Sequence, residues 1–252
     1  MIEDTEEPAT DRATGPRGLP AVTFRWWEAL LAYVIGSLFL GGLAFAAMGA
    51  SRADAAPIRE VAGVIALDIV FLVSLMVWLR NVHPGSWAAI GIRWRARTAA
   101  VGVVFGAILY AVAAGALAFG LQWIYEQVVG HPVQAPEQMP QGLGDAGTVA
   151  FVILAVALAP VVEEVFFRGV LYRSIRDRFG VAAGLVGSSV VFGVVHVQPG
   201  PVADAVLLQS VMVFTGVGLA LIYERAGNLL ASIAAHAAFN AIGVTLILQA
   251  RV

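Results

Sequence analysis

Residues 159–168 read Ala-Pro-Val-Val-Glu-Glu-Val-Phe-Phe-Arg and place two adjacent glutamates, Glu163 and Glu164, inside an otherwise apolar stretch. A charged side chain near the centre of a bilayer costs at least about 2.5–3.5 kcal/mol on insertion scales. Ionisable residues inside membrane helices usually face partners within the protein and mark a functional site. The stretch therefore predicts a membrane helix that contributes carboxylates to a site shared with other helices.

The composition of the whole chain is that of a polytopic membrane protein. Of its 252 residues, 60% are hydrophobic and 13% are charged, whereas globular domains carry about 25% charged residues. The net charge of −2 gives no sign of nucleic-acid binding, and the absence of Cys excludes disulfides and thiolate nucleophiles. All basic residues are Arg, which together with many Ala and Gly suggests a GC-rich bacterial genome.

Seven apolar segments are near the length that crosses a hydrocarbon core of about 30 Å as a helix. They predict an all-α transmembrane helix bundle whose last four spans form a core around the acidic pair. Most Arg residues fall on one side of this alternating topology, and only Arg52, Arg59 and Arg251 fall on the other. By the positive-inside rule we expect a multi-pass protein of the bacterial plasma membrane with a cytoplasmic N-terminus. The predicted spans are 27–49, 58–80, 99–122, 148–170, 181–198, 204–224 and 228–249.

The sequence also predicts three regions. Residues 1–25 are acidic at first and broken by Pro and Gly, which predicts a disordered cytoplasmic tail without a cleavable signal peptide. Residues 26–147 hold the N-terminal transmembrane helices and a long outer loop, 123–147, which is either functional or a flexible connector. Residues 148–252 form the transmembrane core that contains Glu163 and Glu164. Within span three, Gly102 and Gly106 allow close helix packing.

Two of the four His residues are candidates for the site. His83 and His131 lie beside prolines in predicted loops and are set aside, whereas His196 and His236 lie inside apolar helices. A lone intramembrane His is often a helix–helix hydrogen bond, but two His together with two Glu favour a functional site.

Helical spacing divides the work of the two glutamates. Residues four apart share one helix face, so Arg168 can pair with Glu164 while Glu163 points about 100° away, toward a cavity. A helix rises about 1.5 Å per residue. On this basis Glu163 lies roughly 10–15 Å from the cytoplasmic end of its predicted span and His196 roughly 22 Å from that of its own, so His196 does not match the depth of Glu163. The pairs at this spacing are Glu164 with Arg168, Phe192 with His196, and His236 with Asn240.

A carboxylate and two imidazoles can hold a water molecule directly or through a metal ion. In both versions Glu163 is the candidate general base, and His and Asn side chains can donate to a developing oxyanion. Glu163, His196 and His236 also match a common ligand set for catalytic zinc, which is the candidate metal. The sequence leaves open whether a metal is required.

Competing motifs are weak or absent. The chain has no His-Glu-x-x-His zinc motif and no Gly-x-Ser-x-Gly nucleophile turn. Gly142-Leu143-Gly144-Asp145 spells the Gly-x-Gly-Asp string of intramembrane aspartyl proteases, but it lies in a predicted loop. A second aspartate for that chemistry would be Asp68, a lone acid in span two, or Asp204 at a helix start. Asp68 could instead line the cavity or pair with a neighbouring helix.

The ordered motifs resemble those of the CPBP family of intramembrane proteases, the CAAX protease and bacteriocin-processing group. That family is marked by Glu-Glu-x-x-x-Arg, Phe-x-x-x-His and His-x-x-x-Asn on successive core helices. The resemblance is strong over about 150–245 and general over the first three spans, which implies that the last four spans, within 148–252, form the catalytic core. The matching residues are Glu163, Glu164, Arg168, Phe192, His196, His236 and Asn240.

The resemblance implies a glutamate-dependent endopeptidase, often called a metalloprotease, although a metal-free mechanism has also been argued for the family. It implies that Glu163 activates water with His196 and that His236 and Asn240 stabilise the oxyanion, while Glu164, Arg168 and Phe192 support them. The expected substrate is a membrane-associated peptide or protein; the prenylated substrates of eukaryotic relatives are not carried over. Two alternatives stay open: a non-catalytic membrane binding or bacteriocin-immunity protein, and a small transporter or proton relay.

Overall fold

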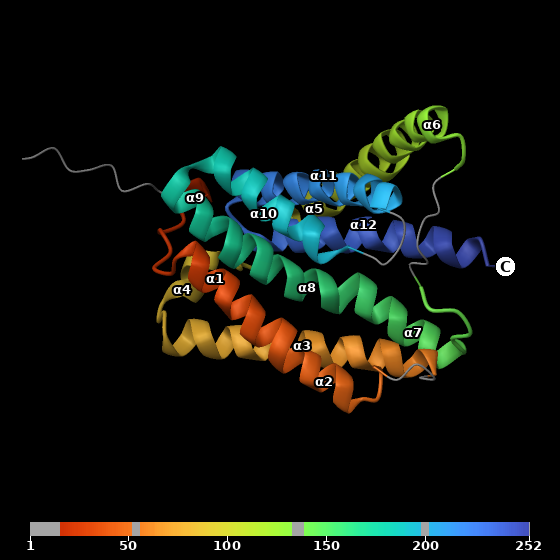
Figure 1. The fold of residues 1–252 in the computed structure, drawn as a ribbon. Helices are drawn as coiled ribbons and strands as arrows, with labels where there is room; N and C mark the ends of the chain where they lie inside the picture. Colours follow the sequence, from red (N-terminus) through yellow and green to blue (C-terminus); the bar gives the residue numbers. More distant parts are fainter. Residues whose placement is uncertain (1–15, 52–55, 133–138, 198–201, 252) are drawn as a thin grey trace, which may run out of the picture.

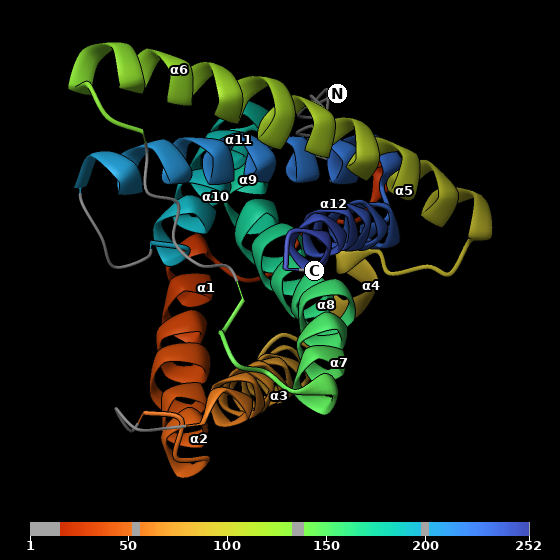
Figure 2. The ribbon, with the colours of Figure 1, turned by 90° about the vertical axis from the view of Figure 1, so that its right-hand side faces the viewer.

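The computed structural model of the chain describes residues 16–51, 56–132, 139–197 and 202–251. These residues form helices and connecting segments, with no β-strand among them, so the predicted all-α class is confirmed. The helices lie lengthwise beside one another in an elongated bundle (Figure 1). Seen end-on, α12 (Leu229–Gln249) lies in the middle of the bundle, between α5 (Ala96–Tyr110) and α8 (Ala159–Glu164) (Figure 2).

Six helices in the described part of the chain are long and apolar enough to cross a membrane. Three of them are continuous helices in which α-helical turns alternate with π-helical segments. These three are Trp26–Ala47 (α1, Trp26–Tyr33; η2, Val34–Gly41; α2, Gly42–Ala47), Ala96–Val129 (α5; η3, Ala111–Leu117; α6, Ala118–Val129) and Asp145–Phe179 (α7, Asp145–Ile153; η4, Leu154–Leu158; α8; η5, Val165–Tyr172; α9, Arg173–Phe179). The other three are α3 (Pro57–Asn81), α12 and Asp204–Ala226, which is most of α11 (Val202–Ala226). Shorter elements are the 3₁₀ turn η1 (Pro16–Gly18), α4 (Ser86–Ile90) and α10 (Val181–Val195).

All seven predicted spans fall on helices, but two predicted ends are wrong. The helix predicted to end at 122 continues to Val129, and the one predicted to end at 170 continues to Phe179. Hydropathy falls where polar side chains such as Gln122 and Arg173 begin, yet the backbone there stays helical. The predicted fifth span corresponds to α10, whose 15 residues reach only about 22 Å and are short for a hydrocarbon core of about 30 Å.

The outer surface of the bundle is apolar. Leu38, Phe39, Val104, Phe119 and Val186 are each at least 60% exposed. A water-soluble domain rarely leaves so many large apolar side chains open, whereas lipid tails solvate them. The surface therefore agrees with the membrane-length helices in indicating a multi-pass membrane protein.

Two glycines let α5 lie directly against α12. A Cβ atom at Gly102 would lie 2.4 Å from the carbonyl oxygen of Ala231, and one at Gly106 would lie 2.1 Å from that of Ala235. Both distances are below van der Waals contact, so only glycine allows this approach. The close packing expected from the Gly-x-x-x-Gly spacing is therefore present, and it holds the helix that carries His236.

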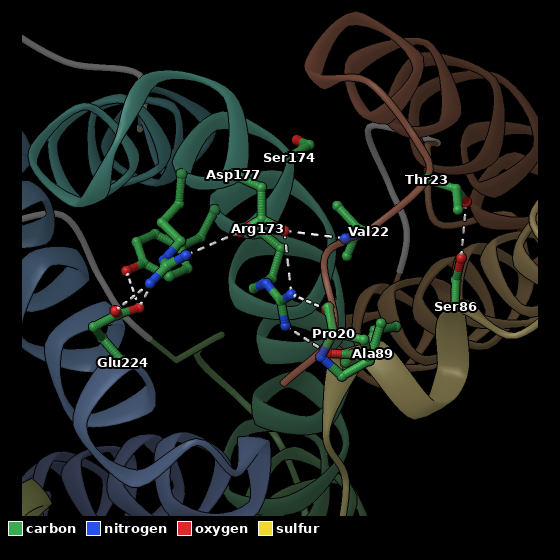
Figure 3. A network of polar contacts seen from close by, with 12 residues as sticks. Pro20, Val22, Thr23, Ser86, Ala89, Arg173, Ser174, Asp177 and Glu224 are labelled. Atoms are coloured by element: carbon green, nitrogen blue, oxygen red, sulfur yellow. Dashed lines mark hydrogen bonds and ion pairs between the residues drawn. The ribbon is translucent and has the colours of Figure 1, made fainter. Parts of the chain in front are cut away.

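At one end of the bundle, buried Arg173 joins segments that are far apart in the sequence (Figure 3). Its guanidinium donates hydrogen bonds to the carbonyl oxygens of Pro20 and Ala89 and to Asp177, which also accepts from the backbone N–H of Val22. The network ties the chain before α1 to α4 and α9.

Part of the segment predicted as a tail, residues 1–25, is packed against the bundle. Residues 1–15 lie outside the described part of the chain, but residues 16–25 pack on the bundle, with Leu19 and Phe24 buried. Leu19 packs against Gly91, where a Cβ atom would lie 2.6 Å from it. Apolar side chains between Pro and Gly residues thus anchor a segment whose composition had suggested disorder.

The boundary between the N-terminal helices and the catalytic core, at 147/148, stays a prediction.

The glycine packing gives a first prediction. Gly106→Ala places a methyl group against the Ala235 carbonyl, so α5 and α12 must separate and the protein should unfold at a lower temperature in detergent. Gly120→Ala is the matched control, because a Cβ atom there meets nothing within 4 Å. Equal melting temperatures for the two variants would contradict the close approach.

Candidate active site

A helical hairpin brings Glu163 and His196 to the same level. Glu163 lies 17 residues before Gly180, where φ is +90° and the chain turns, and His196 lies 16 residues after it. Glu163 and His196 therefore each lie about 25 Å from this turn, along helices that run in opposite directions. The sequence predicted that His196 lies further than Glu163 from the cytoplasmic end of its span. That prediction was wrong, because the helix of Glu163 continues to Phe179, nine residues past its predicted end at 170.

The carboxylate of Glu163 faces both candidate imidazoles. Its Oε2 atom lies 3.7 Å from His196 Nε2 and 3.9 Å from His236 Nε2. This oxygen is buried and has no hydrogen-bond partner among the residues that the structure describes, although the Glu163 side chain as a whole is 24% exposed. The structure thus brings together three predicted site residues from three helices, around one oxygen atom.

Glu164, by contrast, is fully buried, and both of its carboxylate oxygens accept hydrogen bonds. Its Oε1 accepts hydrogen bonds from Arg168 Nη1 at 2.6 Å and from His236 Nδ1 at 2.8 Å. Its Oε2 accepts a hydrogen bond from the hydroxyl of Ser232. Because the carboxylate has charged and neutral donors on both oxygens, the cost of burying it is largely offset. The predicted pair with Arg168 is present, and Glu164 also reaches across to α12.

Hydrogen bonds fix the orientation of both imidazoles. His196 Nδ1 lies 2.7 Å from the carbonyl oxygen of Phe192, which can only accept, so Nδ1 carries the proton. His236 Nδ1 likewise donates to the Glu164 carboxylate. In each neutral ring Nε2 is therefore the unprotonated nitrogen. Both Nε2 atoms, and their lone pairs, are turned toward Glu163.

Phe192 and Arg168 pack together behind these groups. The Arg168 guanidinium carbon lies 4.6 Å from the centre of the Phe192 ring, a cation–π contact. The same ring lies 4.4 Å from that of His196 and 6.0 Å from that of His236, measured between ring centres. Phe192 is thus the aromatic wall expected from its spacing, and its ring contacts both Arg168 and His196.

Asn240 lies on the face of α12 that carries His236, and its amide nitrogen donates to the carbonyl oxygen of Ala155, 2.8 Å away. Its position beside the site was predicted, but this partner was not.

Sequence reasoning also missed Ser232. Its hydroxyl contacts Glu164 and lies 3.0 Å from the carbonyl oxygen of Leu219. Ser232 precedes His236 by four residues, so the helical spacing that grouped His236 with Asn240 was signal enough to include it.

The aspartates of the alternative protease hypothesis lie apart. Gly147 packs beside Ile58, so Asp145, the exposed first residue of α7, lies near the start of α3. Asp68 lies ten residues beyond Ile58, about 15 Å further along α3. Asp68 is buried, and its Oδ2 has no hydrogen-bond partner in the described structure. Asp204 is buried in the first turn of α11.

The two histidines that were set aside have local contacts. His83 is buried and lies against Thr23 and Glu28, where it supports the segment before α1. His131 is exposed and contacts the carbonyl oxygen of Pro132.

The residues match a zinc site only in part. Two imidazoles with unprotonated Nε2 atoms and one carboxylate have the donor chemistry of a zinc site. Within residues 16–51, 56–132, 139–197 and 202–251, however, no group of three or more His, Cys, Asp or Glu side chains is arranged to hold a metal ion. Zinc binding stays a prediction.

Fold and site together define a class, the polytopic helical membrane proteins with ionisable side chains meeting between the helices. Residues 145–242 match the Rce1-like family, described as type II CAAX prenyl endopeptidase. The predicted resemblance is thereby confirmed, and it places the chain among peptidases. The match includes α7–α12 up to 242, with every site residue named above except Asp68, and excludes α1–α6. No curated protein and no solved structure matches the chain significantly.

The buried ion pair generates a second prediction. Arg168→Met leaves the Glu164 carboxylate without its cation and should destabilise the protein by about 3–5 kcal/mol, as breaking a buried pair does. The double variant Glu164→Gln with Arg168→Met should recover part of the loss in denaturation experiments. Arg178→Met, at an exposed position of α9, is the control. An Arg168→Met protein as stable as the parent would show that Glu164 does not need its partner.

Proposed function

We propose that the chain is an intramembrane endopeptidase that hydrolyses peptide bonds of membrane-associated substrates, with Glu163 as the general base. The single observation that carries this proposal is the buried Oε2 of Glu163, which faces two imidazole nitrogens and has no hydrogen-bond partner in the described part of the chain. Intramembrane carboxylates are costly, and most are paired. Glu164 accepts hydrogen bonds from three donors, so within this adjacent pair Glu163 is the carboxylate that is available to act as a base.

The three facing atoms need protons from elsewhere. Glu163 Oε2 and the Nε2 atoms of neutral His196 and His236 are all acceptors, so none can donate to another. Separations of 3.7 and 3.9 Å let one water molecule reach two of them with hydrogen bonds of about 2.8 Å. Such a water is held by Glu163 and His196 and is activated by their basicity.

Peptide hydrolysis then follows in two proton transfers. The water oxygen attacks the carbonyl carbon of the substrate while Glu163 takes one water proton, giving a tetrahedral intermediate. After His236 takes up a solvent proton on Nε2, while its Nδ1–H stays on Glu164, it donates to the oxyanion together with an Asn240 N–H. When the carbon–nitrogen bond breaks, Glu163 returns the proton to the leaving amine. Glu164, Arg168 and Phe192 keep the imidazoles in place.

The Glu163 variant provides the third prediction. Glu163→Gln keeps the size of the side chain and removes its basicity, so cleavage of a membrane-tethered peptide by the purified, reconstituted protein should fall by about 10²–10⁴-fold. Glu60→Gln makes the same chemical change at an exposed position of α3 and should leave turnover unchanged.

Undiminished turnover by Glu163→Gln would contradict the proposed base. A Glu163→Gln protein that keeps its cellular effect would instead favour the non-catalytic binding or immunity protein. Metal analysis of both proteins, before and after chelator treatment, separates the two versions of the site. Stoichiometric zinc that is lost with Glu163→Gln would assign Glu163, His196 and His236 as metal ligands.

A further inference from the structure

The helix that carries Glu163 changes its hydrogen-bond register just before the acidic pair. In the π-helical segment η4, the backbone N–H of Ala159 bonds to the carbonyl oxygen of Leu154, five residues back. The next residue in this register is Pro160, which has no N–H. Its acceptor would have been the carbonyl oxygen of Ala155, which therefore lacks that backbone donor.

The side chain of Asn240 occupies the place of the missing donor. Its Nδ2 lies 2.8 Å from the carbonyl oxygen of Ala155, across the contact between α12 and η4. A primary amide has two N–H bonds. With one of them on Ala155, the plane of the amide is fixed, and the second N–H is available to another acceptor.

We propose that Pro160 is a positioning residue, which leaves the Ala155 carbonyl to Asn240 and thereby aims the second amide N–H of Asn240 at the substrate oxyanion. Pro160 precedes Glu163 by three residues and is itself buried, so the same turn of helix holds the base and orients the oxyanion donor. The inference deepens the proposed function and rests on its assignment of Asn240.

The test is a double-mutant cycle of Pro160→Ala and Asn240→Ala in the reconstituted full-length protein. Pro160→Ala gives residue 160 an N–H that competes for Ala155, so kcat should fall about tenfold, the rate equivalent of one hydrogen bond, with KM and melting temperature maintained. Asn240→Ala should lower kcat by about 10²-fold or more, as loss of an oxyanion donor does. The double variant should be no slower than Asn240→Ala alone. Pro57→Ala, at the start of α3, is the matched control.

Two results would overturn the inference: an unchanged kcat for Pro160→Ala, or independent effects that multiply in the double variant. Melting temperatures test the hydrogen bond from Asn240 to the Ala155 carbonyl oxygen independently of any activity measurement. Asn240→Leu, similar in size but without a donor, should lower the melting temperature, and less so in the Pro160→Ala background. Equal stability of Asn240→Leu and the parent would overturn the inference even if Pro160→Ala fails to fold. A parent protein that cleaves nothing would remove the proposed function, while the stability cycle would still report on the Asn240–Ala155 contact.

Discussion

The carboxylate of Glu164 accepts hydrogen bonds from Arg168 on its own helix and from Ser232 and His236 on α12. Because the carboxylate is fully buried, its charge would be costly without these donors. The two helices that supply the donors are therefore linked through it. The same bond to His236 turns the far nitrogen of that imidazole toward Glu163. One buried charge thus joins two helices and orients a group of the proposed catalytic site.

The rest of the bundle brings the remaining groups to this charge. The turn at Gly180 returns the chain on α10, so that His196 meets Glu163 at the same level of the bundle. Gly102 and Gly106 let α5 contact the backbone of α12 on its other side. At one end of the bundle, Arg173 and Asp177 fix the chain before α1 against α9. Apolar packing alone would leave such helices free to slide, whereas these polar contacts fix their register.

How much of this could be predicted from the sequence depended on whether a contact lies within one helix. The pairs Glu164 with Arg168 and Phe192 with His196 follow from four-residue spacing and are present. The contact of Glu164 with His236 depends on how two helices pack, which periodicity does not give. The depth of His196 was misjudged because polar residues after 170 hid the continuing helix. The bond from Asn240 to Ala155 requires a π-helical register ahead of Pro160, which has no simple sequence signal.

In the proposed mechanism, both imidazoles carry their protons on Nδ1 and present Nε2 to Glu163. Nitrogen-15 NMR of the reconstituted protein, labelled at its four His residues, reports the protonation of each ring nitrogen directly. Substitution of His196 and His236 in turn would assign their signals. We expect a protonated Nδ1 in both rings, with Nε2 either unprotonated or, in the imidazolium form, protonated as well. A ring with an unprotonated Nδ1 and a protonated Nε2, at either position, would contradict it.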